Sequence, residues 1–148
     1  MHSFISCLIH VVFSTKDRKP LITPDLQARL WPYIGGIARD HKMRALMVGR
    51  VADHIHILLS VPSTLSIAKA VQLVKGNSSK WVHETFPTLS TFEWQEGYGA
   101  FSISISGIDN TIAYIENQFE HHIKKTFKEE LRAILKRHGI EFEDWMLD

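Results

Sequence analysis

Two histidines separated by one apolar residue stand inside a run of β-favouring residues. His54 and His56 alternate with Ile55 and Ile57. Because successive side chains of a strand point to opposite faces, the two imidazoles share a face and lie about 7 Å apart along it. This spacing allows both to bind one metal ion, while the isoleucines anchor the other face on the core. Without a third ligand, the pattern equally describes two polar residues on the solvent side of a sheet.

A tyrosine and an amide four residues apart form a second candidate group. Tyr114 and Gln118 are neighbours on one face of a helix expected over residues 108–123. The apolar stripe of this helix lies roughly opposite, so both side chains are expected to point away from the core. A bound divalent ion would make a phosphate more electrophilic. Attack by Tyr114 would give a phosphotyrosine and a free 3′-hydroxyl, and the ester would remain reactive enough for rejoining.

The types of these residues indicate the metal. His54, His56 and the carbonyl oxygen of Gln118 would form a site with two nitrogen ligands, one oxygen ligand and open positions. No cysteine stands near them in the sequence, which argues against a closed structural zinc site. We expect Mg²⁺ or Mn²⁺, and the imidazoles shift the preference toward Mn²⁺.

The composition limits the classes of protein to which this chain can belong. The chain has 148 residues, which fits a single domain over 1–148, and its 45% hydrophobic content is enough for a core. Its one cysteine, Cys7, excludes an internal disulfide framework and suits the reducing cytoplasm. No apolar stretch reaches spanning length and no signal pattern opens the chain, so we predict a cytoplasmic protein. The net charge of +1 does not by itself indicate a nucleic-acid binder.

The order of elements predicts an α+β fold. Thr23 and Thr126 are the expected N-caps of two helices, the second with Glu129 in a capping box. The order is strand, helix, strand, strand, helix, strand and two helices, which matches a ferredoxin-like antiparallel sheet with helices on one face. The histidine face would then be open to a ligand. The expected strands are 4–13, 43–52, 54–59 and 98–106, and the expected helices are 24–41, 65–82, 108–123 and 126–139.

These residues together resemble a known family. The pattern His54-Ile55-His56, followed by Tyr114 and Gln118 as Tyr-x-x-x-Gln, is similar to the single-tyrosine HUH transposases of small bacterial insertion sequences, where HUH denotes His, a hydrophobic residue and His. The resemblance covers nearly the whole chain. It includes Asp53, the polar patch 75–79, the segment 94–102 and the segment 114–122.

The resemblance implies a fold, a reaction and partners. Family members carry a ferredoxin-like catalytic domain, recognise single-stranded DNA hairpins near the element's ends, and cut by forming a 5′-phosphotyrosine. They act as homodimers in which the tyrosine helix can serve the partner's histidine pair. When the roles of the family's motif residues are transferred to this sequence, the resemblance implies that Tyr114 is the nucleophile and that His54, His56 and Gln118 are the metal ligands.

Contacts with DNA are predicted less directly. Lys75, Lys124 and Lys125 are candidates for phosphate contacts, and Trp94 is a candidate for stacking on a base. Each also has an ordinary structural explanation, either as a solvated lysine or as a packed loop anchor.

Three alternatives stay open from the sequence. Tyr98 is a second candidate nucleophile, although its glycine-rich and aromatic surroundings favour packing. A replication-initiator or relaxase-type HUH nuclease would share the cutting step but usually has further motifs. A non-catalytic nucleic-acid-binding module of the same fold would carry aromatic residues at the central strands, where this chain has histidines.

Overall fold

The computed structural model describes residues 1–117 and 125–148. Four strands form one antiparallel sheet in the order β2-β3-β1-β4, the strand order of a ferredoxin-like fold. The α+β prediction is confirmed. In chain order the elements are β1 (Leu8–Ser14), α1 (Pro24–Asp40), β2 (Arg44–Arg50), β3 (His54–Ser60), α2 (Ile67–Thr85), β4 (Gly99–Ile103), α3 (Ile108–Glu116) and α5 (Phe127–Arg137), with short 3-10 turns at Lys16–Arg18, Pro87–Leu89, Ile105–Gly107 and Asp144–Leu147.

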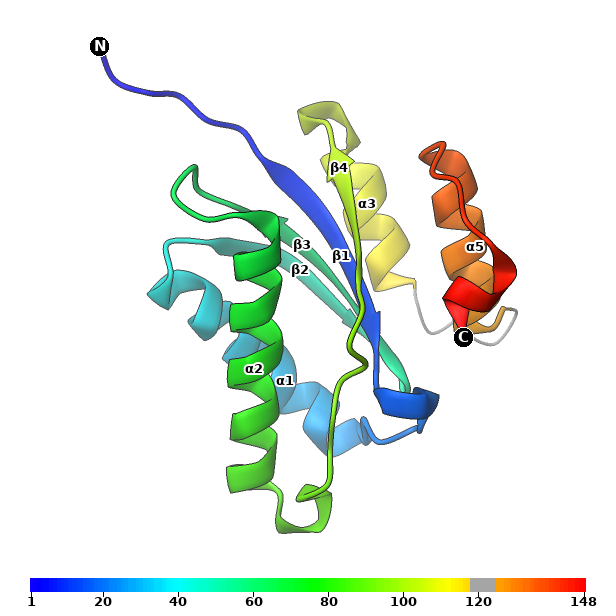
Figure 1. The fold of residues 1–148 in the computed structure, drawn as a ribbon. Coiled ribbons are helices and arrows are strands. Elements are labelled where there is room, and N and C mark those ends of the chain that lie inside the picture. The colour runs from blue at the N-terminus through cyan, green and yellow to red at the C-terminus, as the bar shows by residue number, and fades with distance from the viewer. Residues whose placement is uncertain (118–124) are drawn as a thin grey trace.

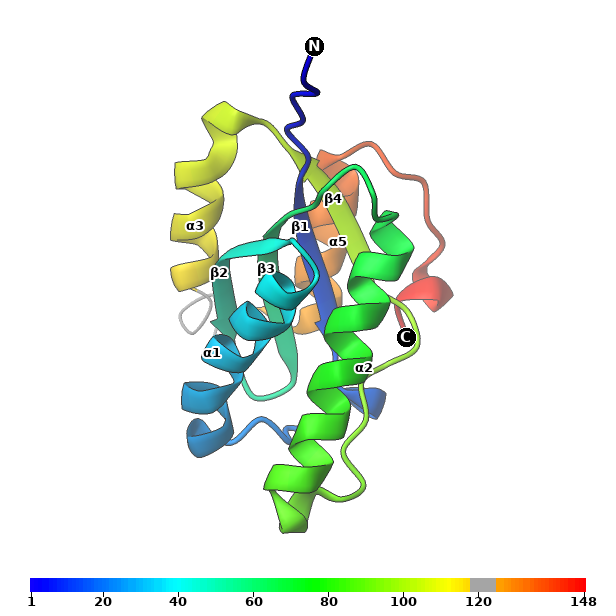
Figure 2. The same cartoon turned by 90° about the vertical axis from the view of Figure 1, so that its left-hand side faces the viewer.

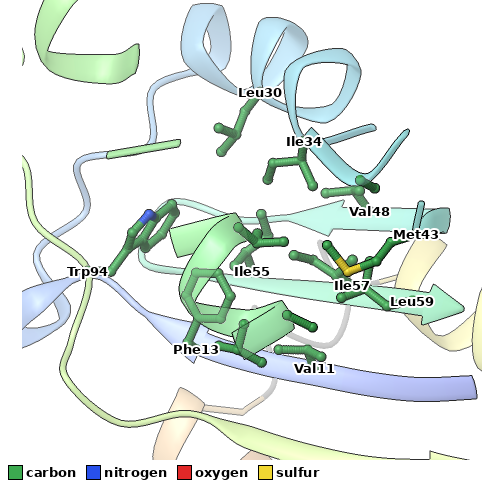
Figure 3. Packing of buried hydrophobic residues seen from close by; sticks show 14 of the residues in the cluster. Val11, Phe13, Leu30, Ile34, Met43, Val48, Ile55, Ile57, Leu59 and Trp94 are labelled. Atoms are coloured by element: carbon green, nitrogen blue, oxygen red, sulfur yellow. The ribbon is translucent and has the colours of Figure 1, made fainter. Parts of the chain in front are cut away.

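Helices α1 and α2 cover one face of the sheet (Figure 1). Ile55 and Ile57 of β3 meet Leu30 and Ile34 of α1 in the main hydrophobic cluster, and all four side chains are fully buried (Figure 3). Burial of each such side chain contributes about 1.5–3 kcal/mol. This face therefore supplies the main stability of the fold and holds β3 rigidly from behind.

The opposite face of the sheet is also covered, by α3 and α5 (Figures 1 and 2). Ile115 of α3 packs on Leu58 of β3, and Phe127 of α5 packs on Val12 of β1. The expectation that helices lie on one face only and leave the histidine face open is therefore wrong. The reason is that α5 has an apolar side of its own, which becomes buried only against this second face.

Most predicted boundaries hold within a few residues. Thr23 accepts a hydrogen bond from the amide of Leu26, and Thr126 accepts one from the amide of Glu129, so both predicted N-caps are confirmed. Strand β1 begins at Leu8 rather than Phe4, because its partner strands β3 and β4 reach only to the residues that pair with Leu8. Helix α3 ends at Glu116, and the remainder of the predicted helix 108–123 falls largely outside the described residues.

Candidate active site

The histidine pair lies on one face of β3, as the alternation predicts. The ring centroids of His54 and His56 are 5.2 Å apart. Both residues are fully buried, so their expected place on a solvent-facing surface is wrong. They are nevertheless not enclosed by apolar groups alone, because polar side chains surround both rings.

Glu130 of α5 reaches between the two imidazoles. Its Oε1 lies 2.9 Å from Nε2 of His56, and its Oε2 lies 3.2 Å from Nε2 of His54. Neither of these two contacts has the alignment of a hydrogen bond. Two imidazole nitrogens and the two oxygens of one carboxylate thus lie close together.

The geometry of this cluster fits a divalent cation. Ligand atoms of His54, His56 and Glu130 all lie within 4.8 Å of one another. Adjacent ligands of an octahedral ion at about 2.1 Å would be roughly 3 Å apart, which is close to the two contacts of Glu130. Two imidazole nitrogens and one carboxylate oxygen suit a divalent cation.

Charge in the cluster is strongly coupled. Burial alone would lower the pKa of His54, but the carboxylates of Asp53 and Glu130 outweigh it and raise the pKa to about 8. Burial alone would raise the pKa of Glu130, but His54, His56 and Tyr114 hold it well below its usual range. Glu130 is therefore ionised and available as a ligand.

Two further side chains orient the imidazoles from behind. Nδ1 of His54 lies 2.7 Å from Oδ1 of Asp53, and Nδ1 of His56 lies 2.8 Å from Nε2 of His10. Burial and the neighbouring His56 lower the pKa of His10 to about 3, which leaves it neutral. Each contact directs Nε2 of its histidine toward Glu130, as outer-sphere partners of metal-binding histidines do.

His10→Phe tests this orientation. Phenylalanine fills a similar volume but cannot accept a hydrogen bond, so the Nδ1–H of His56 would be buried without that acceptor. We expect a loss of about 1–3 kcal/mol in the free energy of unfolding and about tenfold weaker Mn²⁺ binding, measured by urea denaturation and calorimetry. His10→Gln, which retains an acceptor, should recover part of both. Equal metal affinity in all three proteins would contradict an orienting role.

Tyr114 joins the same cluster. Its hydroxyl donates a hydrogen bond to Oε1 of Glu130, and its ring centroid is 5.7 Å from that of His56. The side chain is only partly buried. It is directed toward the histidines rather than away from the core, because α3 lies on the sheet face that carries them. One chain therefore brings the phenol and both imidazoles together.

The position of α3 depends on a glycine in β2. A Cβ on Gly49 would lie 2.2 Å from Cγ2 of Ile115 and 2.7 Å from its backbone oxygen. Since backbone cannot yield as a flexible side chain does, α3 would have to move away from the sheet. The absence of a side chain at residue 49 thus permits the close approach that carries Tyr114 to the histidines.

Gly49→Ala is expected to lower the free energy of unfolding by about 1–3 kcal/mol. It should also reduce any reaction that depends on Tyr114, because the neighbouring Ile115 is displaced. Gly76→Ala is the matched control, since a Cβ there meets nothing within 4 Å and alanine is favoured within α2 by about 0.5–1 kcal/mol. Urea denaturation measures the free energy of unfolding of both variants. Equal values for Gly49→Ala and Gly76→Ala would contradict the close packing of α3 on Gly49.

The other predicted site residues have different surroundings. Gln118 and Lys124 lie outside the described residues, and Lys125 is exposed. Nζ of Lys75 donates to the carbonyl oxygens of three consecutive residues, 95–97, at 2.5, 3.1 and 3.1 Å. Trp94 is 8% exposed and its indole donates to Ser78 at 3.0 Å. Both thus anchor the loop before β4, and their contacts with DNA stay predictions.

Glu130 and His10 are not among the residues that the sequence predicts for the site. Acidic residues in the first turn of a helix usually face solvent, yet Glu130 is buried together with Phe127 and Ile134 on the same side of α5. The signal was available as the spacing 127, 130 and 134, which places this carboxylate within an apolar helix face. For His10 the signal was its alternation with the core residues Ile9 and Val11 of β1.

A ferredoxin-like sheet with paired histidines beside a tyrosine is the arrangement that the resemblance predicted. The family model described as "Transposase IS200 like" matches residues 3–118. The chain therefore belongs to the IS200-like transposase family, and the predicted class of enzyme, a DNA transposase, is confirmed.

Individual relatives agree with this assignment. The transposase for insertion sequence element IS200 from Salmonella typhimurium is 23% identical over 124 residues, which is 84% of this chain and 82% of that protein. The ISDra2 transposase TnpA of Deinococcus radiodurans is 24% identical over 112 residues, 75% of this chain and 80% of that protein.

Solved structures share the fold. A candidate transposase from Deinococcus radiodurans has a TM-score of 0.66 at 22% identity, covering 80% of this chain and 95% of the other. A REP-associated tyrosine transposase bound to a REP hairpin has a TM-score of 0.60 at 16% identity, covering 82% of this chain and 72% of the other. No helix among the described residues has the length and apolar character needed to cross a membrane.

Proposed function

We propose that this transposase cuts and rejoins single-stranded DNA through Tyr114, with His54, His56 and Glu130 holding a divalent cation. The observation that carries the proposal is the convergence of the Tyr114 hydroxyl and both imidazoles on the carboxylate of Glu130.

Tyr114 and Glu130 have different roles in the cleavage step. Oη of Tyr114 forms the new bond to phosphorus, and the bond from phosphorus to the 3′-oxygen breaks. The hydrogen bond to Glu130 orients the hydroxyl and gives its proton a first acceptor on the way to solvent. The leaving 3′-oxygen takes a proton from solvent, so the products are a 5′-phosphotyrosine and a free 3′-hydroxyl. Reversal with another 3′-hydroxyl joins a new strand without an external energy source.

The cation would be Mg²⁺ or Mn²⁺. When bound, it would polarise a non-bridging phosphate oxygen and stabilise the developing charge. His54 and His56 would bind it through Nε2, the atoms that Asp53 and His10 direct toward Glu130. Gln118 is retained from the family pattern as an additional oxygen ligand.

The proposed partners and setting follow the family resemblance and the composition. We expect single-stranded hairpins at the element's ends as substrate, a homodimer as the active form, and one catalytic domain over residues 1–148 in the cytoplasm. Because the Tyr114 hydroxyl already meets Glu130 of its own chain, each subunit has the groups needed to complete a site by itself, and exchange of tyrosine helices between subunits would be a second arrangement.

The decisive experiment is the trapping of a covalent intermediate. Hairpin DNA from the element's ends, carrying single-stranded tails, is incubated with protein and Mn²⁺ and then denatured. We expect a protein–DNA species that survives denaturation and is absent when a chelator is added. A non-catalytic DNA-binding module would give binding but no such species, which would overturn the proposal.

A further inference from the structure

A cleft of about 290 Å³ opens beside Tyr114, between the end of β4, α3 and the end of α5. This volume is at the lower end of the range for ligand pockets, so the cleft suits one small unit such as a nucleotide rather than a duplex. Its lining includes Ser102, Asn110, Thr111, Tyr114, Arg137 and His138, with His10. It is thus a concave site in direct contact with the proposed nucleophile.

The cleft is suited to an anion. Hydroxyl, amide, guanidinium and imidazole groups line it, and none of the described residues that form it carries a carboxylate. The guanidinium of Arg137 lines the same cleft as the buried His10. An anionic group entering here would therefore meet hydrogen-bond donors and a positive potential.

Arg137 is the cation best placed to hold such a group. Along α5, Lys128 and Arg132 are already paired with the acidic side chains of Asp144 and Asp148 near the C-terminus. Within residues 1–117 and 125–148, no carboxylate lies within ion-pairing distance of Arg137. Its guanidinium is exposed and available to form a bidentate contact with a phosphate.

An aromatic surface lies next to this guanidinium. The ring of His138 stacks on Phe101 with the centroids 4.9 Å apart, and His138 is itself exposed. Packing on Phe101 fixes the orientation of the imidazole at the cleft. A nucleobase could stack on such a fixed ring, which is how many proteins hold single-stranded DNA.

The burial of the histidines makes the cleft important for access. Because His54 and His56 are fully buried, a phosphate cannot reach the imidazoles directly from solvent. It has to approach along neighbouring side chains that are themselves in contact with solvent. Tyr114 and His10 belong to the cleft wall and also contact the cluster, through Glu130 and His56 respectively. The cleft therefore leads to the atom that would attack.

We propose that this cleft binds the nucleotide of single-stranded DNA that adjoins the phosphate attacked by Tyr114. Arg137 would contact a flanking phosphate, Asn110 and Ser102 would donate to or accept from the nucleotide, and His138 would support its base. This inference rests on the proposed function, because it takes Tyr114 as the nucleophile. It assigns a substrate subsite to residues outside the histidine, tyrosine and glutamate cluster.

The test compares Arg137→Gln with Lys136→Gln. Both remove one positive charge from adjacent exposed positions of α5, but only Arg137 lines the cleft. Fluorescence anisotropy in the presence of a chelator measures affinity for hairpin DNA with single-stranded tails and for the same hairpin without tails. We expect the wild type and Lys136→Gln to bind the tailed hairpin more tightly than the hairpin without tails. Arg137→Gln should bind the tailed hairpin about five- to tenfold more weakly than the wild type does, with unchanged affinity for the hairpin without tails. Asn110→Ala should show a smaller loss of the same kind.

The outcomes separate this inference from the function on which it rests. Equal losses in Arg137→Gln and Lys136→Gln, or an unchanged tail preference in both Arg137→Gln and Asn110→Ala, would overturn the cleft as a subsite. Covalent trapping with Mn²⁺ on the same DNA tests the function separately. If the wild type forms the adduct but Arg137→Gln does not change the preference for tailed DNA, only the assignment of the cleft is wrong. If wild type forms no adduct, the proposed function fails.

Discussion

Tyr114→Phe is expected to abolish the covalent protein–DNA species while leaving DNA binding nearly intact. The substitution removes the single atom that would bond to phosphorus and changes nothing else in the ring. Loss of a nucleophile typically costs at least about 10³-fold in rate. The adduct is measured on denaturing gels with labelled hairpin DNA, and binding is measured in parallel by anisotropy.

The two other tyrosines of the chain supply the controls. Tyr98 is 42% exposed, and Tyr33 stacks on Trp81 with ring centroids 4.4 Å apart. Tyr98→Phe and Tyr33→Phe should both form the adduct at the wild-type level. Loss of the adduct in Tyr98→Phe with retention in Tyr114→Phe would show that the nucleophile has been assigned to the wrong residue.

Folding of Tyr114→Phe also has to be checked, because the hydroxyl donates to the buried Glu130. A hydrogen bond to a charged group contributes about 1.5–3 kcal/mol. We expect a modest fall in the urea midpoint and an unchanged circular dichroism spectrum. A folded variant without adduct then isolates the chemical role of the phenol.

The fold could be predicted from local patterns in the sequence. Alternation placed Ile55 and Ile57 on the core and His54 and His56 together on the other face, and the threonine caps located two helix starts. These features depend on neighbouring residues only, which is why one sequence suffices for them.

The surroundings of the histidines could not be predicted in the same way. Their burial depends on α5, whose contacts with β3 join residues 54 and 56 to residue 130. No local rule specifies such a long-range pairing. The prediction of an open histidine face followed from the order of strands and helices, which matches a sheet with one uncovered face. The structure shows that the apolar side of α5 is buried against that face.

The candidate site was predicted in part for the same reason. The histidine pair and Tyr114 each occur in a short, recognisable pattern, and the structure brings them together. His10 and Glu130 are distinguished only by their spacing relative to apolar neighbours, which indicates burial but no chemical role, and they come from elements at opposite ends of the chain. Their roles become visible only when β1 is paired with β3 and α5 is packed on the sheet face that carries the histidines.

Glu130→Gln is the second substitution with a large expected effect. Glutamine has nearly the same shape but lacks the charge that pairs with His54 and His56 and would bind the cation. We expect Mn²⁺ affinity to fall at least about tenfold, measured by calorimetry, and the stabilisation of the folded protein by Mn²⁺ to shrink in proportion. In the absence of metal, Glu130→Gln should also lower the free energy of unfolding. Removal of one partner from a buried ion pair typically costs about 3–5 kcal/mol.

Glu129→Gln provides the matched control, since Glu129 is adjacent on α5 but exposed. It should leave metal affinity and adduct formation unchanged. If Glu130→Gln instead binds Mn²⁺ as tightly as wild type and forms more adduct, then Glu130 blocks the histidines in the resting protein rather than binding the ion. That result would assign the third ligand position to Gln118 and would make displacement of α5 a step of the reaction. Weaker metal binding together with less adduct would leave His54, His56 and Glu130 as the metal site.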